Sequence, residues 1–156
     1  MLKIKVLCVG KIKEDYFEKA LAEYKKRLSR FCDFCIEEIP ESRLGGESFS
    51  DIQKALAEEA KVILKKAEGM TIVLDRLGKQ TDSVEFAQLL KKASIDFGKA
   101  TFVIGSSHGV DESVKQRADC LVSFGKITLP HQLFRVVLVE QIYRGFGINN
   151  NSPYHK

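Results

Sequence analysis

Residues 70–105 read MTIVLDRLGKQTDSVEFAQLLKKASIDFGKATFVIG, and this stretch decides the fold. It begins with a continuous apolar run at 70–75 and ends with another at 101–105, which is typical of strands buried inside a parallel sheet. Between them the sequence predicts a helix over 82–97, with a polar residue at its start to cap it and Gly98 to end it. A strand, a crossing helix and a second strand form the repeating unit of α/β proteins.

The same alternation extends outward on both sides of this stretch. Strands are expected at 2–9, 32–39, 70–75, 101–105 and 120–124, and helices at 14–30, from Ser50 or Asp51 to 66, at 82–97, at 111–118 and from His131 onward. The polar segment 76–81 around Gly78 is expected to be a loop. Five strand–helix units predict an α/β fold with a mostly parallel sheet flanked by helices, and 156 residues suit one domain over 1–156.

Composition excludes some classes of protein and leaves others open. The net charge of +4 permits a polyanionic partner without requiring one. No run of 18 apolar residues exists, so no membrane span is expected. The first residues, MLKIKVLCVGK, alternate charged and apolar side chains and lack the apolar core of a signal peptide, so we expect a cytoplasmic protein.

The four cysteines do not form a metal-binding pattern. Cys32 and Cys35 form a lone C-x-x-C in a strand-like run. A zinc site would need two more ligands, and the remaining candidates are Cys8, Cys120 and three histidines at no recognisable spacing. We therefore expect no metal, and structural thiols in a reducing compartment.

Three loops follow strand ends, where open α/β sheets bind their ligands. They come after Asp75, after Gly105 and after Phe124. The second loop, GSSHG at 105–109, has glycines that let backbone amides approach a ligand closely. It is neither the G-x-G-x-x-G of a dinucleotide site nor a P-loop, and a simple strand-to-helix turn remains open as its explanation.

The final stretch, TLPHQLFRVVLVEQIYRGFGINNNSPYHK at 128–156, is apolar around most of its expected helix. Such a helix is buried on more than one side, either as a dimer contact or as the central core helix of a monomer. Glu140 and Arg144 are four residues apart and can pair. After an Asn-rich turn, the tail ends in the hydroxyl, imidazole and ammonium groups of Tyr154, His155 and Lys156.

The residues of this stretch resemble the signature of the ribosomal RNA large subunit methyltransferase H family, in the SPOUT superfamily. The matching pieces are TLPHQLFRVVLVEQIYR at 128–144 and PYHK at 153–156. FVIG at 102–105, GKIK at 10–13 and EYKKRL at 23–28 extend the resemblance over essentially the whole chain. A match over this many positions is far more specific than a lone glycine motif.

The resemblance implies a SPOUT α/β domain with a C-terminal trefoil knot, acting as a homodimer whose site is shared across the interface. It implies methyl transfer from S-adenosyl-L-methionine to N3 of a pseudouridine in 23S rRNA of the assembled ribosome. The implied cofactor-binding residues are Leu74, Gly105, Phe124, Gly125, Lys126, Ile127, Thr128 and Leu129. The family commonly has two adjacent glycines where this chain has Gly105 and Ser106.

The resemblance also makes the tail the catalytic segment. His155 is the candidate base for the N3 proton, because an imidazole titrates near neutral pH. Tyr154 would stack on or hydrogen-bond the base, and Arg144 would stabilise the developing anion or hold phosphate. Lys156 and Arg135 are the expected RNA contacts. The open alternative is that the tail only positions RNA and solvent takes the proton. We expect His131, at a helix start, to anchor the loop before it.

Three other functions remain open at this point. The first is a non-enzymatic ribosome- or RNA-binding module on the same fold. The second is a SPOUT methyltransferase of another RNA, such as tRNA. The third is a small nucleotide-dependent enzyme of the Rossmann type, which the missing glycine motif disfavours.

Overall fold

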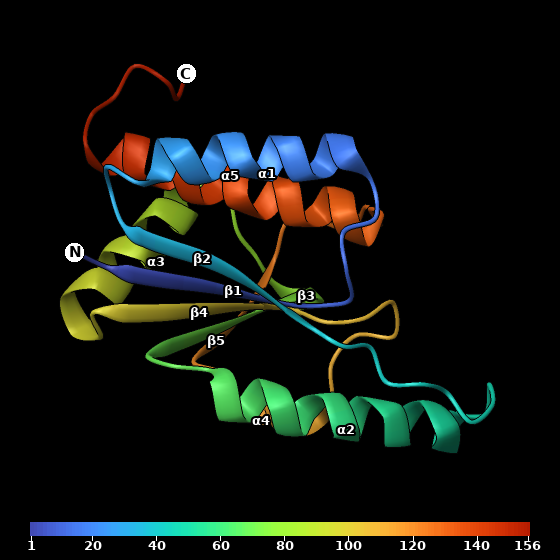
Figure 1. The fold of residues 1–156 in the computed structure, drawn as a ribbon. Helices are drawn as coiled ribbons and strands as arrows, with labels where there is room; N and C mark the ends of the chain where they lie inside the picture. Colours follow the sequence, from blue (N-terminus) through green and yellow to red (C-terminus); the bar gives the residue numbers. More distant parts are fainter.

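The computed structural model describes residues 1–156 and has three layers, a sheet with helices on both faces (Figure 1). Its strands are β1 (Lys3–Val9), β2 (Asp33–Ile39), β3 (Met70–Gln80), β4 (Lys99–Ile104) and β5 (Cys120–Ser123). Its helices are α1 (Asp15–Leu28), α2 (Phe49–Lys66), α3 (Ser83–Asp96), α4 (Glu112–Arg117) and α5 (His131–Asn149). Helices α1, α3 and α5 cover one face of the sheet, and α2 and α4 cover the other.

The five strands form one sheet in the order β2-β1-β4-β3-β5, and every pairing is parallel. The predicted α/β class and helix-flanked sheet are therefore confirmed, with a sheet that is entirely rather than mostly parallel. Parallel strands end at the same edge, so the carboxyl-end half of β3 and the loops that follow β4 and β5 meet there. The trefoil knot implied by the resemblance stays a prediction.

Local sequence signals explain where the helices begin. The Asp82 side chain accepts a hydrogen bond from the Glu85 amide at 2.8 Å, and the Glu85 carboxylate accepts one from the Asp82 amide at 2.9 Å. This capping box starts α3 at the predicted position. Helix α2 begins earlier than the expected cap at Ser50 or Asp51, because Ser48 is the residue whose hydroxyl accepts from the Asp51 amide, at 3.1 Å.

The segment 76–81 is mostly strand, where the sequence predicted a loop. Strand β3 continues to Gln80, but its register against β5 shifts so that Leu74 and Lys79 both pair with Val122. The residues between them bulge out of the ladder. Gly78 is required here, because a Cβ would lie 2.7 Å from the Leu121 carbonyl carbon. The bulge carries polar side chains to the carboxyl edge of the sheet.

Helix α5 is a central helix of this single chain. It packs against both α1 and α3, and Leu138, Val139 and Ile142 are fully buried. A Cβ at Gly145 would lie 2.5 Å from Leu90 Cδ1, so the small residue permits close contact with α3. Contacts within one chain therefore account for much of the all-round apolar surface of α5. The homodimer stays a prediction.

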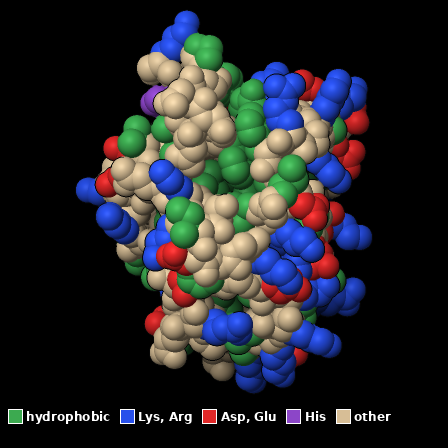
Figure 2. Space-filling model, turned by 90° about the vertical axis from the view of Figure 1, so that its left-hand side faces the viewer, with side chains coloured by type: hydrophobic (Ala, Val, Ile, Leu, Met, Phe, Trp, Pro, Cys, Tyr) green, Lys and Arg blue, Asp and Glu red, His purple; other side chains and the backbone are tan.

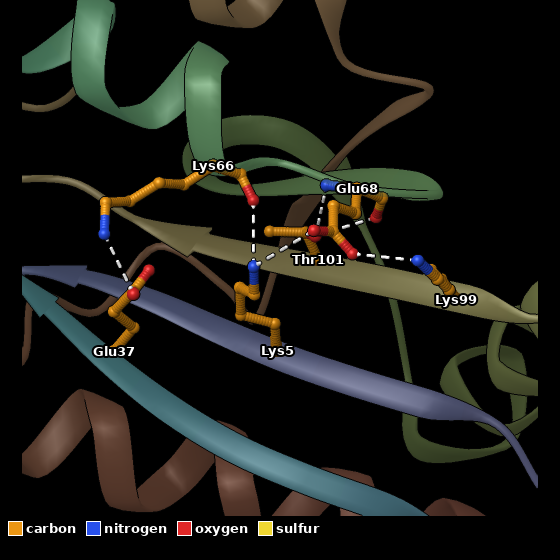
Figure 3. A network of polar contacts seen from close by, with 6 residues as sticks. All are labelled: Lys5, Glu37, Lys66, Glu68, Lys99 and Thr101. Atoms are coloured by element: carbon orange, nitrogen blue, oxygen red, sulfur yellow. Dashed lines mark hydrogen bonds and ion pairs between the residues drawn. The ribbon is translucent and has the colours of Figure 1, made fainter.

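A network of charged side chains ties the β2–β1–β4 part of the sheet to the end of α2 (Figure 3). Lys5 donates to the Lys66 carbonyl at 3.1 Å, and Lys66 pairs with Glu37 at 2.9 Å. Glu68 pairs with Lys99 at 3.1 Å. The Glu68 backbone also exchanges hydrogen bonds with Thr101, at 2.8 and 2.9 Å.

None of the five helices combines the length and apolarity needed to cross a bilayer.

Candidate functional site

A cavity of about 390 Å³ opens at the carboxyl edge of the sheet. The bulge of β3 and the loops that follow β4 and β5 form most of its wall. The lining comprises Leu74, Asp75, Arg76, Leu77, Ile104, Gly105, Ser106, Ser107, His108, Gly109, Val110, Lys115, Val122, Ser123, Phe124, Ile127, Thr128, Leu129, His131 and Phe134. The structure thus brings together the three strand ends at which the sequence placed a ligand.

Six of the eight residues predicted to bind the cofactor line this cavity. They are Leu74, Gly105, Phe124, Ile127, Thr128 and Leu129. Gly125 and Lys126 lie in the same loop but do not line the cavity. Sequence reasoning gave no site role to Lys115, Ser123 or Phe134, which also line it. Nothing in the local sequence marks Lys115, because its position depends on the packing of a short helix beneath the bulge of β3.

The loop after β4 is a tight turn held by its own backbone. Gly109 adopts φ +87° and its amide donates to the Ser106 carbonyl at 2.8 Å. A Cβ at Gly105 would lie 2.4 Å from the Gly109 carbonyl oxygen, so this position has room for glycine alone. Ser106, which stands where the family often has glycine, is buried, and its hydroxyl accepts from the His108 amide at 3.3 Å. The serine closes the turn.

The loop after β5 begins with a residue that packs in the core and continues with one that is exposed. The Phe124 ring lies 5.6 Å from that of Phe86 and 5.7 Å from that of Phe134, which holds it in the core. Gly125 has φ +122°, and its amide donates to the Ser123 hydroxyl at 3.1 Å. Ile127, by contrast, is 82% exposed although it lines the cavity. The loop therefore presents an apolar side chain to whatever covers the cavity.

Permanently charged groups in the cavity are few, and each has a partner. Lys115 Nζ lies 3.1 Å from Asp75 Oδ2, and Arg76 donates to Thr128 Oγ1 at 3.4 Å. Burial lowers the pKa of His131, so its imidazole is neutral at neutral pH. His131 begins α5 directly after the loop, and its role as the anchor of that loop stays a prediction.

The C-terminal tail forms a second cluster around Arg144. Its guanidinium pairs with Glu140 at 2.7 Å, which confirms the predicted pair, and lies 3.2 Å from His155 Nδ1. It also sits over the Tyr154 ring, 4.7 Å from the centroid. Tyr154 meets Tyr143 edge-on at 4.9 Å. The structure therefore brings together the three residues that the sequence named as catalytic.

The cavity and the tail cluster lie at opposite ends of α5. His131 at the start of α5 lines the cavity, whereas Arg144 is 13 residues further along. At 1.5 Å per residue this is about 20 Å, and Figure 1 shows the chain terminus at the far end of the helix. Figure 2 views that end, where apolar side chains gather in a hollow flanked by lysine and arginine side chains. No tail residue lines the cavity of its own chain.

Arg135 does not lie where an RNA contact would. Its side chain is 4% exposed and pairs with Glu38 at 2.8 Å and with the Gly10 carbonyl at 3.2 Å. A phosphate cannot reach a guanidinium that is enclosed in this way, so the expected RNA contact is replaced by a structural one. Arg135 fastens the β1–α1 loop and β2 to the first turns of α5. Lys156, in contrast, is exposed.

The two cysteines of the C-x-x-C pair differ in solvent exposure. Cys32 is buried, which raises the pKa of its thiol to about 12, whereas Cys35 is exposed. Burial likewise raises the pKa of Cys8 to about 12 and that of Cys120 to about 11. Thiols with such pKa values stay protonated, as structural cysteines do. No group of three or more His, Cys, Asp or Glu side chains is placed to hold a metal ion.

The fold and the cavity define an α/β protein with a cavity of small-molecule size at the carboxyl edge of a parallel sheet. Residues 2–155 match the family model described as "Predicted SPOUT methyltransferase". The chain belongs to this SPOUT methyltransferase family. A solved structure titled as a probable methylase family protein from Haemophilus influenzae Rd KW20 has the same fold. Its TM-score is 0.56 at 15% identity, over 100% of this chain and 72% of that one.

Curated relatives are similar over their whole length. A protein of Streptococcus pyogenes serotype M5 (strain Manfredo), named "Ribosomal RNA large subunit methyltransferase H", is 46% identical over 99% of this chain and 100% of its own. A protein of the same name from Streptococcus equi subsp. equi (strain 4047) matches with the same identity and coverage. The family resemblance drawn from the sequence is thereby confirmed.

Proposed function

We propose that this chain is an S-adenosyl-L-methionine-dependent methyltransferase that modifies N3 of a pseudouridine in 23S rRNA of the assembled ribosome. The observation that carries the proposal is the 46% identity, over 99% of the chain, to proteins named as large subunit ribosomal RNA methyltransferases. The cavity supports it, because it lies at the loops where the resemblance puts the cofactor. Action on ribosomes implies a cytoplasmic protein.

The cavity residues fit an adenosyl group bearing an amino acid. A volume of about 390 Å³ is within the usual range for small-molecule sites. Leu74, Phe124 and Leu129 supply apolar walls for a planar base, and the loop backbone supplies hydrogen-bonding groups. The cofactor contributes a methyl group already activated on a sulfonium. The protein then has to align that methyl with its acceptor and exclude water.

We infer that the working site combines the cavity of one subunit with the tail of another. Within one chain the two clusters are about 20 Å apart along α5, too far to act on one nucleotide. A homodimer in which the tail of each copy reaches the partner's cavity would complete two equal sites. Leu77 in the bulge of β3 and Ile127 in the loop after β5 are 83% and 82% exposed, and they offer apolar surface for such a contact.

In this arrangement His155 takes the N3 proton of the acceptor base. Its Nδ1 faces the Arg144 guanidinium at 3.2 Å, a donor, which leaves Nδ1 as the acceptor and Nε2 as the protonated nitrogen in the neutral ring. A small rotation of the tail would free a ring nitrogen for the proton. Arg144 remains beside it as the cation that stabilises the developing anion. Tyr154 offers a stacking face, and Lys156 an RNA phosphate contact.

The role of His155 can be tested in one variant. His155→Ala should lower the single-turnover rate by about 10²–10⁴-fold with ribosome binding retained, as expected for loss of a general base. An unchanged rate would show that the tail only positions RNA and that solvent takes the proton. Lys19→Met is the control, since this exposed side chain lies outside both the cavity and the tail cluster and its loss should leave the rate unchanged.

The whole proposal is tested by labelled-methyl transfer to ribosomes that lack the modification, with the nucleoside identified by mass spectrometry. A 3-methylpseudouridine in 23S rRNA is the expected product. A methylated nucleoside in another RNA would identify a SPOUT methyltransferase of different specificity. A folded chain that binds ribosomes but neither binds nor uses the cofactor would identify a non-enzymatic RNA-binding module.

A further inference from the structure

One ion pair in the cavity has no part in the chemistry described above. Lys115 comes from α4 and Asp75 from the start of the β3 bulge, and their charged atoms are 3.1 Å apart. Their side chains are only 27% and 15% exposed, yet both line the cavity. The ion pair therefore borders the ligand space, where a bound molecule can reach it.

The two residues have bonding capacity to spare. Asp75 Oδ1 accepts from the Leu77 amide at 3.0 Å, which fixes the carboxylate within the bulge, and Oδ2 faces Lys115. A carboxylate accepts about four hydrogen bonds in all. An ammonium has three donors, and Asp75 is the sole protein partner that the structure gives Lys115. Each group can therefore take a ligand charge without giving up its partner.

The other residues that line the cavity leave Asp75 and Lys115 as the main charged contacts for a ligand. Asp75 is the only carboxylate among the twenty lining residues, so a ligand cation has one place to be neutralised. Arg76 is the other permanent cation, but it is exposed and donates to Thr128. Lys115 is the more enclosed of the two, and a charge-assisted hydrogen bond is stronger where water is scarce.

We propose that Asp75 and Lys115 recognise the zwitterionic amino-acid end of the cofactor. The α-ammonium would contact Asp75 and the α-carboxylate Lys115, so that four charges of alternating sign close a ring. The two side chains would then distinguish a complete adenosyl amino acid from adenosyl compounds that lack it. This inference rests on the proposed function, and it assigns the pair a role in cofactor specificity rather than in methyl transfer.

The test is direct binding by titration calorimetry, without ribosomes. The probes are S-adenosylhomocysteine, its analogue without the carboxylate, and 5′-methylthioadenosine, which lacks the whole amino-acid end. Lys115→Met should weaken S-adenosylhomocysteine binding about tenfold to a hundredfold, the size of one charge-assisted hydrogen bond. It should change the affinity for the other two probes by less than about twofold.

A second variant separates recognition from damage to the fold. Asp75→Asn keeps an oxygen for the Leu77 amide but loses the charge. It should therefore weaken both ligands that carry the ammonium and leave 5′-methylthioadenosine unchanged. Lys99→Met is the matched control, because it breaks a Lys–Glu pair of the same 3.1 Å length outside the cavity (Figure 3). Binding of all three probes should be unaffected by it.

Two results would overturn the inference, and they differ. If Lys115→Met weakens all three probes equally, or none, the pair is structural and the cofactor site stands without it. If the wild-type chain binds none of the probes, the proposed function fails and this inference fails with it.

Discussion

Two inactive variants of this chain should restore each other's activity when they are mixed. The first is His155→Ala, which damages the tail cluster. The second is Gly105→Val, which damages the cavity, because its Cβ would lie 2.4 Å from the Gly109 carbonyl oxygen and force the loop after β4 to move. Each variant keeps intact the half of the site that the other has lost. Complementation is possible only if a site takes its halves from different chains.

The fraction of activity recovered follows from which chain supplies the cavity and which supplies the tail of each site. Tail and cavity are about 20 Å apart along α5, so each working site would need the cavity of one chain and the tail of its partner. Random exchange of equal amounts makes half of the dimers mixed, and one of the two sites in each mixed dimer has both halves intact. About a quarter of all sites would then be active, against almost none for either variant alone.

The assay is methyl incorporation into unmodified ribosomes after the variants are mixed, mildly dissociated and reassociated. Differently tagged chains, captured in sequence, confirm that mixed dimers are present. Thermal melting checks that Gly105→Val remains folded. Mixed dimers with no more activity than the separate variants would refute the shared site, and a chain that sediments as a monomer while fully active would do the same.

Two further predictions concern stability. Arg135→Met should lower the free energy of unfolding in urea by about 1–3 kcal/mol, less than for a fully buried pair, because Glu38 is 39% exposed and can be hydrated. Lys19→Met, which removes an exposed pair with Asp15, should change it by under about 0.5 kcal/mol, and equal losses would contradict the structural role of Arg135. Glu59→Gln should stabilise the chain in a pH-dependent way. Burial raises the pKa of Glu59, so wild-type stability falls as pH rises from the unfolded pKa towards the folded one. The variant does not lose stability in this range, so the stability difference between variant and wild type should be small in acid and grow towards neutral pH. Melting curves that show the same difference at every pH would contradict this prediction.

The sequence predicted the sheet well because parallel strands are buried on both faces. The runs 70–75 and 101–105 are apolar apart from Thr71, Thr101 and the terminal Asp75, and the structure pairs them side by side in β3 and β4. The second half of β3 was not predicted, because it has no continuous apolar run. Most of its residues are polar and lie around a bulge, so backbone pairing with β5 places them in the sheet, and backbone pairing leaves no pattern in the side chains.

The site was predicted in pieces rather than as a whole. Strand ends and glycines mark the loops of the cavity, since both are local features of the sequence. The role of Arg135 depends on Glu38 and Gly10, which lie 97 and 125 residues away, and no local rule connects them. The place of the tail, by contrast, follows from chain order, because the cavity loop precedes α5 and the tail follows it.

The tail is nevertheless positioned by local chemistry that the Asn-rich turn encodes. Asn151 takes φ +55°, a conformation that asparagine tolerates better than most residues, and lets the chain reverse after α5. The Ser152 amide then donates to the Gly147 carbonyl at 2.8 Å, and the Ser152 hydroxyl accepts from the Tyr154 amide at 3.3 Å. Tyr154 is thereby set against Arg144 before any RNA is bound. Under the proposed function the tail is the catalytic segment, and a segment ordered in advance loses little entropy on meeting its substrate, so His155→Ala should reduce the rate of transfer without weakening ribosome binding.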